Sequence, residues 1–375
     1  MNDDFLHSMK EAFDLLRTKG PKEATAAVQR ALGGGAHPSA GLGDPQMPQM
    51  PPMPPIPPMP QSAADWVNAW KNTQAHAPTQ TRPQPQAAYT VDADTPGTFS
   101  THSFSNNAGR RDYKLYVPAA YGNEPVPLIV MLHGCTQNAD DFAAGTRMNE
   151  LAERHGMLVV YPNQAASANH SGCWNWFKPG DQHRESGEPS LIAGITREVM
   201  SCYRVDPARV YVAGLSAGGA MADIMLKTWP DLYAAAGVHS GLACGSARDL
   251  PSALAAMKGG KTPRGRSQAE PARPLIVFQG DADSTVHPSN ASALVAPFAG
   301  GSTTSSQPVD SQGRQRGYTV QHLIATNGVP AESWSIRGAG HAWSGGNQRG
   351  SYTDPSGPDA SAEMLRFFLA HPQRG

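Results

Sequence analysis

The residues from 210 to 219, with the sequence VYVAGLSAGG, have the types and spacing that most directly imply chemistry. A short β-branched run leads into a Gly-x-Ser-x-Gly pattern, and a helix-compatible segment from Ala220 to Lys227 follows it. Strand, sharp turn and helix in this order place Ser216 at the apex of the turn, in a strained conformation that exposes its Oγ. Gly214 and Gly218 let backbone and helix approach where a Cβ would clash. The pattern therefore predicts that Ser216 is a nucleophile.

A serine hydroxyl is a weak nucleophile at neutral pH, so it needs a general base and a group that orients this base. His341 is the candidate base, because it lies in the Gly-rich sequence GAGHAW directly after an expected strand. Two acids follow an earlier strand. We favour Asp283 over Asp281 as the orienting group, since an Asp in the tight turn itself usually caps its own backbone. Ser216, Asp283 and His341 then occur in the chain order of α/β-hydrolases.

The same chemistry requires two backbone N–H groups that stabilise the oxyanion of a tetrahedral intermediate. One should belong to Ala217, the residue that follows the nucleophile. The other should come from the loop after an early central strand, where the sequence LHGCT makes Cys135 the third residue of a His-Gly-x turn. A nucleophilic thiol at Cys135 is the alternative role, but no base adjoins it in any motif.

Aromatic residues gather near these candidates. Trp343 follows the candidate base by two residues, and Trp174 and Trp176 lie in the run CWNWF. A tryptophan in a catalytic loop is suited to line a substrate pocket, so we predict that these three side chains contact substrate. Packing in the core, the usual role of an aromatic cluster, is the alternative.

Strand-like and helix-like segments alternate from about residue 97 onward, and these elements must position the candidates. Strands are expected over Tyr113–Val117, Leu128–Leu132, Met157–Tyr161, Val210–Ala213, Ala234–Val238, Leu275–Phe278 and Ser333–Arg337. Helices are expected over Ala139–His155, Leu191–Tyr203, Ala217–Lys227, Ser289–Pro297 and Asp359–Leu369. This alternation predicts an α/β fold with a mainly parallel central sheet and helices on both faces.

Composition divides the chain into three parts. Residues 1–33 carry short helical patterns, residues 34–95 form a linker rich in Pro, Met, Gln and Ala, and residues 96–375 carry the α/β domain. In the linker an apolar side chain recurs every third residue, which would align one face of a polyproline II helix. The positions are Met47, Met50, Met53, Ile56 and Met59. Two interpretations of this segment are open: it is a plain spacer, or residues 1–60 bind a polymer or granule surface or the rim of the enzyme's own pocket.

The bulk composition excludes several classes of protein. The formal net charge is −1 and no Lys/Arg-rich block occurs, which argues against nucleic-acid binding. No apolar run reaches the length of a transmembrane segment. The acidic N-terminus lacks the pattern of a secretory signal, so we predict a cytoplasmic protein, with export by another route as the alternative.

The four cysteines, Cys135, Cys173, Cys202 and Cys244, are spread singly along the chain. Neither their spacing nor any cluster of His, Asp and Glu indicates a metal site, and no cofactor motif is present. Four cysteines allow three full pairings, among which the sequence does not choose. Reduced thiols are the expectation for a cytoplasmic protein.

Four segments are informative as a set: LHGCTQNA from Leu132, CWNW from Cys173, GLSAGGAMA from Gly214 and GHAW from Gly340. Together they resemble the esterase family of poly(3-hydroxybutyrate) depolymerases, which also includes feruloyl and acetyl-xylan esterases. The resemblance spans roughly residues 100–370. It implies an α/β-hydrolase that cleaves esters of short hydroxyacids, with Ser216, Asp283 and His341 as its catalytic triad.

The resemblance leaves the substrate open. No polymer-binding domain follows the last expected helix, which favours soluble oligomers or an amorphous granule over crystalline polymer. A feruloyl or acetyl-xylan type carbohydrate esterase, or a general short-chain carboxylesterase, is the alternative enzyme. A granule- or surface-binding protein with an incidental hydrolase domain is the non-enzymatic alternative, and the intact set of nucleophile, acid and base argues against it.

Overall fold

The computed structural model describes residues 95–260, 271–306 and 308–373. The chain divides into two compact units, and every described residue belongs to the unit Pro83–Gly375. The predictions for the helical segment 1–33, for the Pro/Met-rich linker and for a polymer-binding role of residues 1–60 therefore lie outside the described residues.

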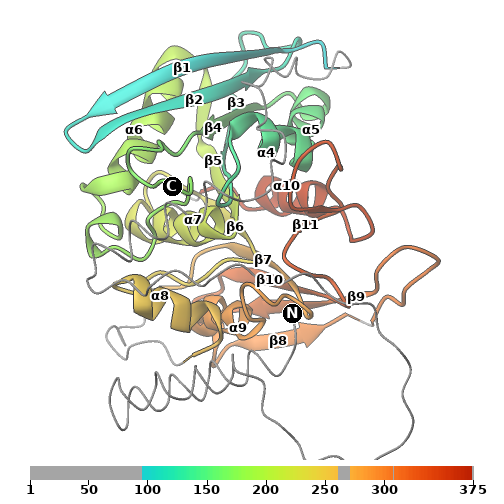
Figure 1. The fold of residues 1–375 in the computed structure, drawn as a ribbon. Coiled ribbons are helices and arrows are strands. Elements are labelled where there is room, and N and C mark those ends of the chain that lie inside the picture. The colour runs from blue at the N-terminus through green and yellow to red at the C-terminus, as the bar shows by residue number, and fades with distance from the viewer. Residues whose placement is uncertain (1–94, 261–270, 307, 374–375) are drawn as a thin grey trace, which may run out of the picture. The chain divides into compact units, whose positions relative to one another are not determined.

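A ten-stranded sheet lies at the centre of the described unit, in the order β1-β2-β4-β3-β5-β6-β7-β10-β9-β8 (Figure 1). The strands are β1 Thr98–Asn106, β2 Gly109–Val117, β3 Val126–Leu132, β4 Leu158–Pro162, β5 Val205–Leu215, β6 Ala235–His239, β7 Leu275–Gly280, β8 Ser302–Ser305, β9 Tyr318–Ile324 and β10 Pro330–Ile336. The six strands from β4 to β10 in this order pair in parallel. Antiparallel pairs extend the sheet at both edges. A separate small ladder joins β11 (Trp343–Ser344) to β12 (Thr353–Asp354) in parallel.

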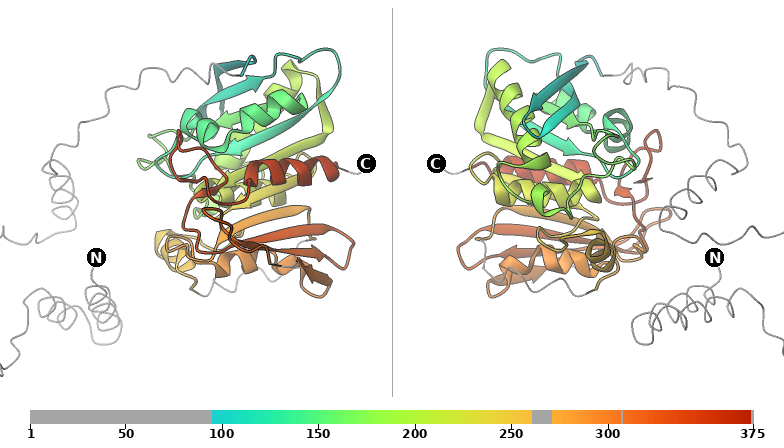
Figure 2. Two further views of the ribbon diagram at one scale, coloured as in Figure 1. Left: turned by 90° about the vertical axis from the view of Figure 1, so that its right-hand side faces the viewer. Right: turned by 60° about the vertical axis from the view of Figure 1, so that its left-hand side comes forward.

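Helices cover both faces of this sheet (Figure 2). They are α4 Ala139–Thr146, α5 Met148–His155, α6 Gly187–Cys202, α7 Ala217–Thr228, α8 Leu250–Met257, α9 Ser289–Leu294 and α10 Ala360–Ala370, with the short 3-10 helices η1 Pro179–Asp181 and η2 Ala296–Phe298. Successive side chains of a strand point to opposite faces. Leu128 and Val130 of β3 therefore pack in the core of α6 and α7, whereas Ile129 and Met131 pack in the core of α4, α5 and α10. The predicted α/β architecture is confirmed.

The sequence does not reveal the edges of the sheet. Strand β8 has the sequence STTS and is exposed throughout, and β1 holds only exposed and half-buried residues, so neither carries a strong apolar pattern. The predicted helix Ala139–His155 is also wrong in one respect, because it is broken into α4 and α5 at Arg147. Arg147 has a φ of 55° and is not a glycine or proline, so no residue type marks the break.

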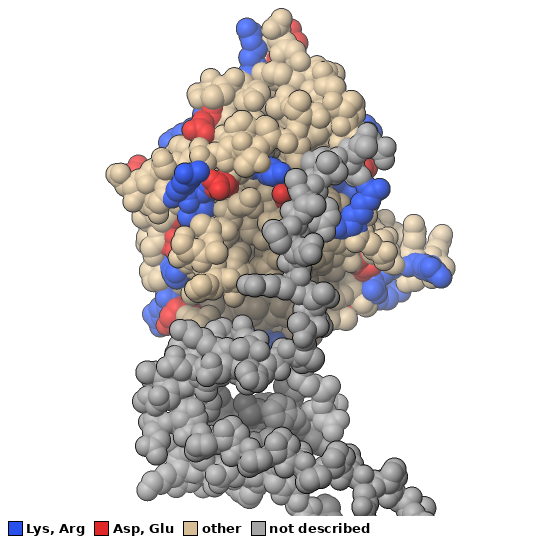
Figure 3. Space-filling view, turned by 45° about the horizontal axis from the view of Figure 1, so that its top comes forward, with Lys and Arg blue, Asp and Glu red and all other residues tan. Residues whose placement is uncertain are grey.

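Charged side chains are scattered among neutral ones on the described part of the face shown in Figure 3, without a continuous basic surface. Across the residues that the structure describes, no helix is both long enough and apolar enough to cross a membrane.

Candidate active site

The loops that carry the candidate residues follow parallel strands near the centre of the sheet. They therefore all leave the sheet at the carboxyl ends of these strands. The ends of these strands pair in register: Leu215 of β5 with His239 of β6, His239 with Phe278 of β7, and Gly280 of β7 with Ile336 of β10. Ser216 follows β5, Asp283 follows β7 and His341 follows β10. Ends of parallel strands are the usual place for a binding site in such sheets.

The turn between β5 and α7 places Ser216 in a strained conformation, with φ 57° and ψ −118°. A positive φ at a residue other than glycine costs free energy, so this backbone conformation persists only where the surrounding structure enforces it. Here the enforcing contact is the close approach of the helix: a Cβ on Gly218 would overlap the carbonyl oxygen of Leu132, and one on Gly214 would overlap the backbone of Gly218. The Ser216 N–H donates to the His239 carbonyl at 2.9 Å, which fixes the apex to β6.

Asp283 and His341 form a hydrogen-bonded pair. The Asp283 Oδ2 accepts from His341 Nδ1 at 2.8 Å, with the carboxylate fully buried and the imidazole 12% exposed. The other oxygen, Oδ1, accepts from the N–H groups of Thr285 and Val286, each at 2.9 Å. Burial by itself would raise the pKa of Asp283, but the bonds from His341 and the two N–H groups outweigh it and hold the pKa below its ordinary value.

An ionised carboxylate can only accept hydrogen bonds, so His341 Nδ1 carries the proton of this contact. In the neutral imidazole the lone pair then lies on Nε2, the nitrogen that can act as a base. Asp281 has a different partner: its Oδ1 accepts from the N–H of Gly338 at 2.6 Å and so ties the loop after β7 to the loop after β10. The structure therefore brings Asp283, and not Asp281, to His341.

The N–H groups of Cys135 and Ala217 lie at the ends of neighbouring strands, since Leu132 of β3 pairs with Gly214 of β5. Neither N–H has a hydrogen-bond acceptor among the described residues. Two free donors beside Ser216 are what an oxyanion requires.

Cys135 forms a disulfide bond with Cys173, and their Cα atoms are 4.2 Å apart. The expectation of reduced thiols is therefore wrong for this pair, and a nucleophilic Cys135 is excluded because its sulfur is bonded. Sequence spacing could not reveal the pairing, since the two residues are separated by 38 positions and meet only in the folded chain. Cys202 and Cys244 lie outside this bond.

The three tryptophans predicted to contact substrate are buried instead: Trp174 is 0% exposed, Trp343 is 1% exposed and Trp176 is 6% exposed. Trp343 Nε1 donates to Ser361 at 3.0 Å, and its ring packs edge-on against Phe142. The apolar surface of an indole favours burial where the fold offers a hydrophobic core. This burial agrees with the alternative of core packing, and substrate contact by these side chains stays a prediction.

Tyr352 is an exposed aromatic side chain beside the candidate site, and no sequence pattern singled it out. It is 47% exposed, has a φ of 51°, and its hydroxyl lies 3.1 Å from Thr136 Oγ1, next to Cys135. Its carbonyl accepts from the N–H of Trp343 at 2.7 Å, so the residue joins the loop of Cys135 to the loop of His341. The only signal in the sequence is an isolated tyrosine in the polar run GSYTDPSG.

His239 connects the turn between β5 and α7, which we call the elbow, to the loop of His341. Its carbonyl accepts from Ser216, and its Nε2 accepts from the N–H of Ser344 at 3.0 Å. Its ring stacks on Phe278 and Trp343. Burial, reinforced by the nearby His341, lowers the pKa of His239 to about 3. His239 therefore stays neutral, which leaves Nε2 free to accept.

His133 supports the opposite side of the site in the same way. Its Nε2 accepts from the N–H of Gln164 at 3.1 Å, and its Nδ1 donates to the carbonyl of Gly134 at 2.8 Å. Burial lowers the pKa of His133 to about 4. Within the described residues, no group of three or more His, Cys, Asp and Glu side chains is arranged to hold a metal ion.

Comparison with known proteins adds to this geometry. The family described as "Esterase PHB depolymerase" matches residues 111–317. The protein "Poly(3-hydroxyalkanoate) depolymerase C" of Paucimonas lemoignei is 34% identical over 251 residues, which cover 64% of this chain and 60% of that protein. "Acetylxylan esterase A" of Talaromyces purpureogenus is 29% identical over 214 residues, which cover 52% of this chain and 55% of that protein. The chain thus spans little more than half the length of these two relatives.

A solved structure, "Acetyl xylan esterase from Aspergillus awamori", resembles the fold with a TM-score of 0.53 and 21% sequence identity. The similarity covers 72% of this chain and 99% of the other. Together with the strand order, this similarity shows that the fold is that of the α/β-hydrolases.

The crowding at the elbow can be tested with Gly218→Ala. The added Cβ would overlap the Leu132 carbonyl, so we expect the free energy of unfolding to fall by about 1–3 kcal/mol or more. The matched control is Gly180→Ala, where an added Cβ meets nothing within 4 Å and the change should stay within about 0.5 kcal/mol. Chemical denaturation measures both, and equal stability of the two variants would contradict the close approach.

The two buried histidines predict a pH dependence. Each has a folded pKa below its unfolded value of about 6.5, so each takes up a proton on unfolding, and stability should fall as pH drops from about 6.5 toward 4. Near pH 5 each histidine should contribute a slope of about 1.4 kcal/mol per pH unit. The His239→Gln variant should take up one proton fewer on unfolding, so the slope of its unfolding free energy against pH should be smaller by about 1.4 kcal/mol per pH unit. Denaturation curves between pH 4 and 7 test this, and an unchanged slope would show that His239 is not held neutral.

Proposed function

Since this chain belongs to the PHB depolymerase family of esterases and is a carboxylic ester hydrolase, we propose that it hydrolyses the ester bonds of poly(3-hydroxybutyrate) or its oligomers. In this proposal Ser216, Asp283 and His341 form the catalytic triad. The observation that carries the triad is the pair of Asp283 and His341, hydrogen bonded at 2.8 Å at the sheet edge where the strained Ser216 also lies. The substrate is supported by the description of the matching family and by the Paucimonas lemoignei relative, whose name gives the broader class of poly(3-hydroxyalkanoates).

In the proposed acylation step, Ser216 Oγ attacks the ester carbonyl carbon while His341 Nε2 takes its proton. The N–H groups of Cys135 and Ala217 donate to the oxyanion of the tetrahedral intermediate, and the buried Asp283 carboxylate stabilises the imidazolium. When the intermediate collapses, the alcohol oxygen of the next hydroxybutyrate unit leaves with the proton from His341. The product is an acyl-enzyme on Ser216.

Water completes the cycle in the second half of the proposed mechanism. His341 Nε2 removes a proton from the water as it attacks the acyl carbonyl, and the proton then passes to Ser216 Oγ as the ester bond to the serine breaks. This step releases a chain that ends in a carboxylic acid and restores the enzyme. The chain that ends in a free hydroxyl has already left during acylation. No redox partner is needed for either step.

A carbohydrate ester is the second candidate substrate, because the acetylxylan esterase of Talaromyces purpureogenus also matches the chain. Purified enzyme offered a hydroxybutyrate trimer, an acetylated xylo-oligosaccharide and methyl ferulate in parallel separates the candidates. We expect the highest kcat/KM on the trimer. A higher kcat/KM on the acetylated xylo-oligosaccharide or on methyl ferulate, a model of the feruloyl esters of plant polysaccharides, would favour the second candidate and reject the polyester substrate.

The roles within the triad are tested by three variants. Ser216→Ala removes the attacking oxygen and should reduce kcat to below about a hundredth of the wild-type value, because triad members typically supply far more than this. Asp283→Asn should cost on the order of 10⁴ in kcat, since the amide favours the wrong tautomer of His341.

Asp281→Asn is the matched control, because it changes a nearby exposed carboxylate that bonds Gly338 and not His341. Its kcat should stay within about tenfold of wild type, well above that of Asp283→Asn. Hydrolysis of p-nitrophenyl butyrate measures all three variants. A mild Asp283→Asn together with a severe Asp281→Asn would reverse the assignment of the acid.

A further inference from the structure

Two loops lie against each other at the site: the oxyanion loop (residues 133–139) and a second loop, which we call the clamp loop (residues 163–177). One disulfide bond and three hydrogen bonds join them: Cys135–Cys173, Thr136 N–H to Ser171 O at 2.8 Å, Gln164 N–H to His133 Nε2 at 3.1 Å, and Ala139 N–H to Asn163 Oδ1 at 2.7 Å. The position of the Cys135 N–H therefore depends on the clamp loop.

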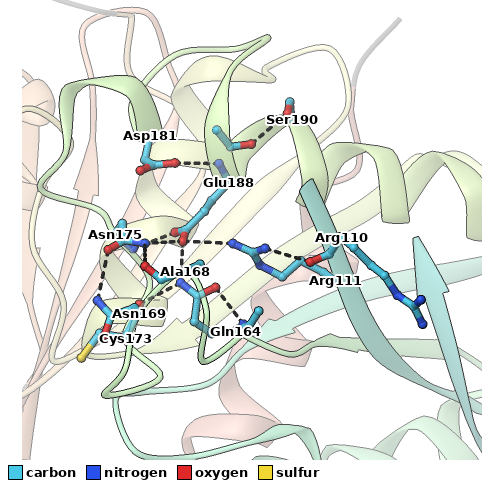
Figure 4. Close-up of polar contacts among 12 residues, drawn as sticks. Arg110, Arg111, Gln164, Ala168, Asn169, Cys173, Asn175, Asp181, Glu188 and Ser190 are labelled. Carbon is cyan, nitrogen blue, oxygen red and sulfur yellow. Dashed lines mark hydrogen bonds and ion pairs between the residues drawn. The ribbon is translucent and has the colours of Figure 1, made fainter. Parts of the chain in front are cut away.

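The clamp loop is itself held by a buried carboxylate, Glu188, in the first turn of α6 (Figure 4). Glu188 is 2% exposed. Its Oε2 accepts from the backbone N–H of Asn175 at 2.7 Å, and its Oε1 accepts from Asn175 Nδ2 at 2.7 Å and from Gln164 Nε2 at 2.5 Å. Gln164 Nε2 also donates to the carbonyl of Cys173 at 2.8 Å. The carboxylate thus accepts hydrogen bonds from Gln164, before Cys173 in the clamp loop, and from Asn175, after it.

Further contacts fix Glu188. Asp181 Oδ1 accepts from the Glu188 N–H at 2.7 Å, which holds the start of α6. Arg111, 6% exposed, extends from β2 and places Nη2 3.4 Å from Glu188 Oε1. A buried carboxylate with several donors is rigid, because moving any donor leaves a charge unsatisfied in a medium of low dielectric constant.

We propose that Glu188 is a positioning residue for ester hydrolysis: it holds the clamp loop so that the disulfide places the Cys135 N–H where the oxyanion forms. This inference rests on the proposed function, because it concerns the oxyanion site of that reaction. The carboxylate does not touch substrate and acts through Gln164, Asn175 and the disulfide. It therefore affects the stabilisation of the transition state and leaves the binding of the ground-state ester largely intact.

The test compares Glu188→Gln with wild type. The amide cannot accept at both oxygen positions, so one donor of the clamp loop loses its partner. Complete loss of one oxyanion donor lowers kcat by about a hundredfold to a thousandfold, so a displaced donor should cost about tenfold to a hundredfold, with KM changed by less than about threefold. Gln164→Ala, a partly buried and milder change, removes the bridge from Glu188 to the Cys173 carbonyl and should shift kcat in the same direction.

The matched control is Glu332→Gln on β10. Glu332 is also a buried carboxylate, 7% exposed, and accepts from Trp334 Nε1 and from Arg366 Nη2, but it lies near the start of β10, away from the His341 loop. Its variant should lose thermal stability without a change in kcat. A purely structural Glu188 would behave in the same way, with lower stability and wild-type kcat, and that result would overturn the inference.

A double-mutant cycle with Cys173→Ala tests the route through the disulfide. If both changes act through the clamp loop, the double variant should be about as slow as the slower single variant, whereas multiplied effects would show independent actions and overturn the proposal. Should Glu188→Gln fail to fold, Gln164→Ala replaces it in the cycle. Wild type and Ser216→Ala are assayed alongside: absence of Ser216-dependent hydrolysis in wild type would reject the proposed function, whereas normal wild-type activity with unaffected Glu188→Gln would reject this inference alone.

Discussion

The close approach of α7 to strands β3 and β5 determines where the candidate nucleophile stands. Gly214 and Gly218 permit backbone contacts that a Cβ would prevent, and the turn between them holds Ser216 at φ 57°. The same turn leaves the N–H of Ala217 without an acceptor among the described residues and sets it beside the end of β3, where Cys135 follows. The candidate nucleophile and the candidate oxyanion donors therefore depend on one steric constraint, which the backbone geometry of the turn sets.

Around this constraint, buried polar groups connect the loops that deliver the other components. Neutral His239 joins the elbow to the His341 loop, and neutral His133 joins the oxyanion loop to the clamp loop. Both must remain unprotonated at Nε2, which burial ensures by lowering each pKa. Glu188 also connects segments of the site, but it must be ionised to do so. Its two carboxylate oxygens accept the hydrogen bonds that hold the clamp loop. Burial therefore keeps the two histidines neutral, whereas at Glu188 burial raises the pKa and the hydrogen bonds from Gln164 and Asn175 oppose that rise.

Local sequence patterns identified those parts of the fold and site that local chemistry determines. The glycines around Ser216, the apolar strand Leu128–Leu132 and the Gly-rich loop of His341 each carry their signal within a few residues. Contacts between distant segments left no such signal: the partner of Cys135 lies 38 residues away, Tyr352 reaches Thr136 across more than 200 residues, and Glu188 becomes significant only once α6 meets the clamp loop. Likewise, the local pattern did not indicate how deeply Trp174, Trp176 and Trp343 are buried, because burial depends on the core that distant segments form around their apolar surface.

The most direct measurement of the central claim, that the strained Ser216 is the attacking group, is covalent labelling of the full chain with diethyl p-nitrophenyl phosphate followed by peptide mapping. The phosphorus ester imitates the tetrahedral intermediate, so it should react where the nucleophile, base and oxyanion donors converge. We expect one diethylphosphoryl group per chain, on Ser216, with esterase activity lost in proportion to labelling, and much slower labelling in Asp283→Asn. A label on any other residue, or full loss of activity with Ser216 unmodified, would contradict it.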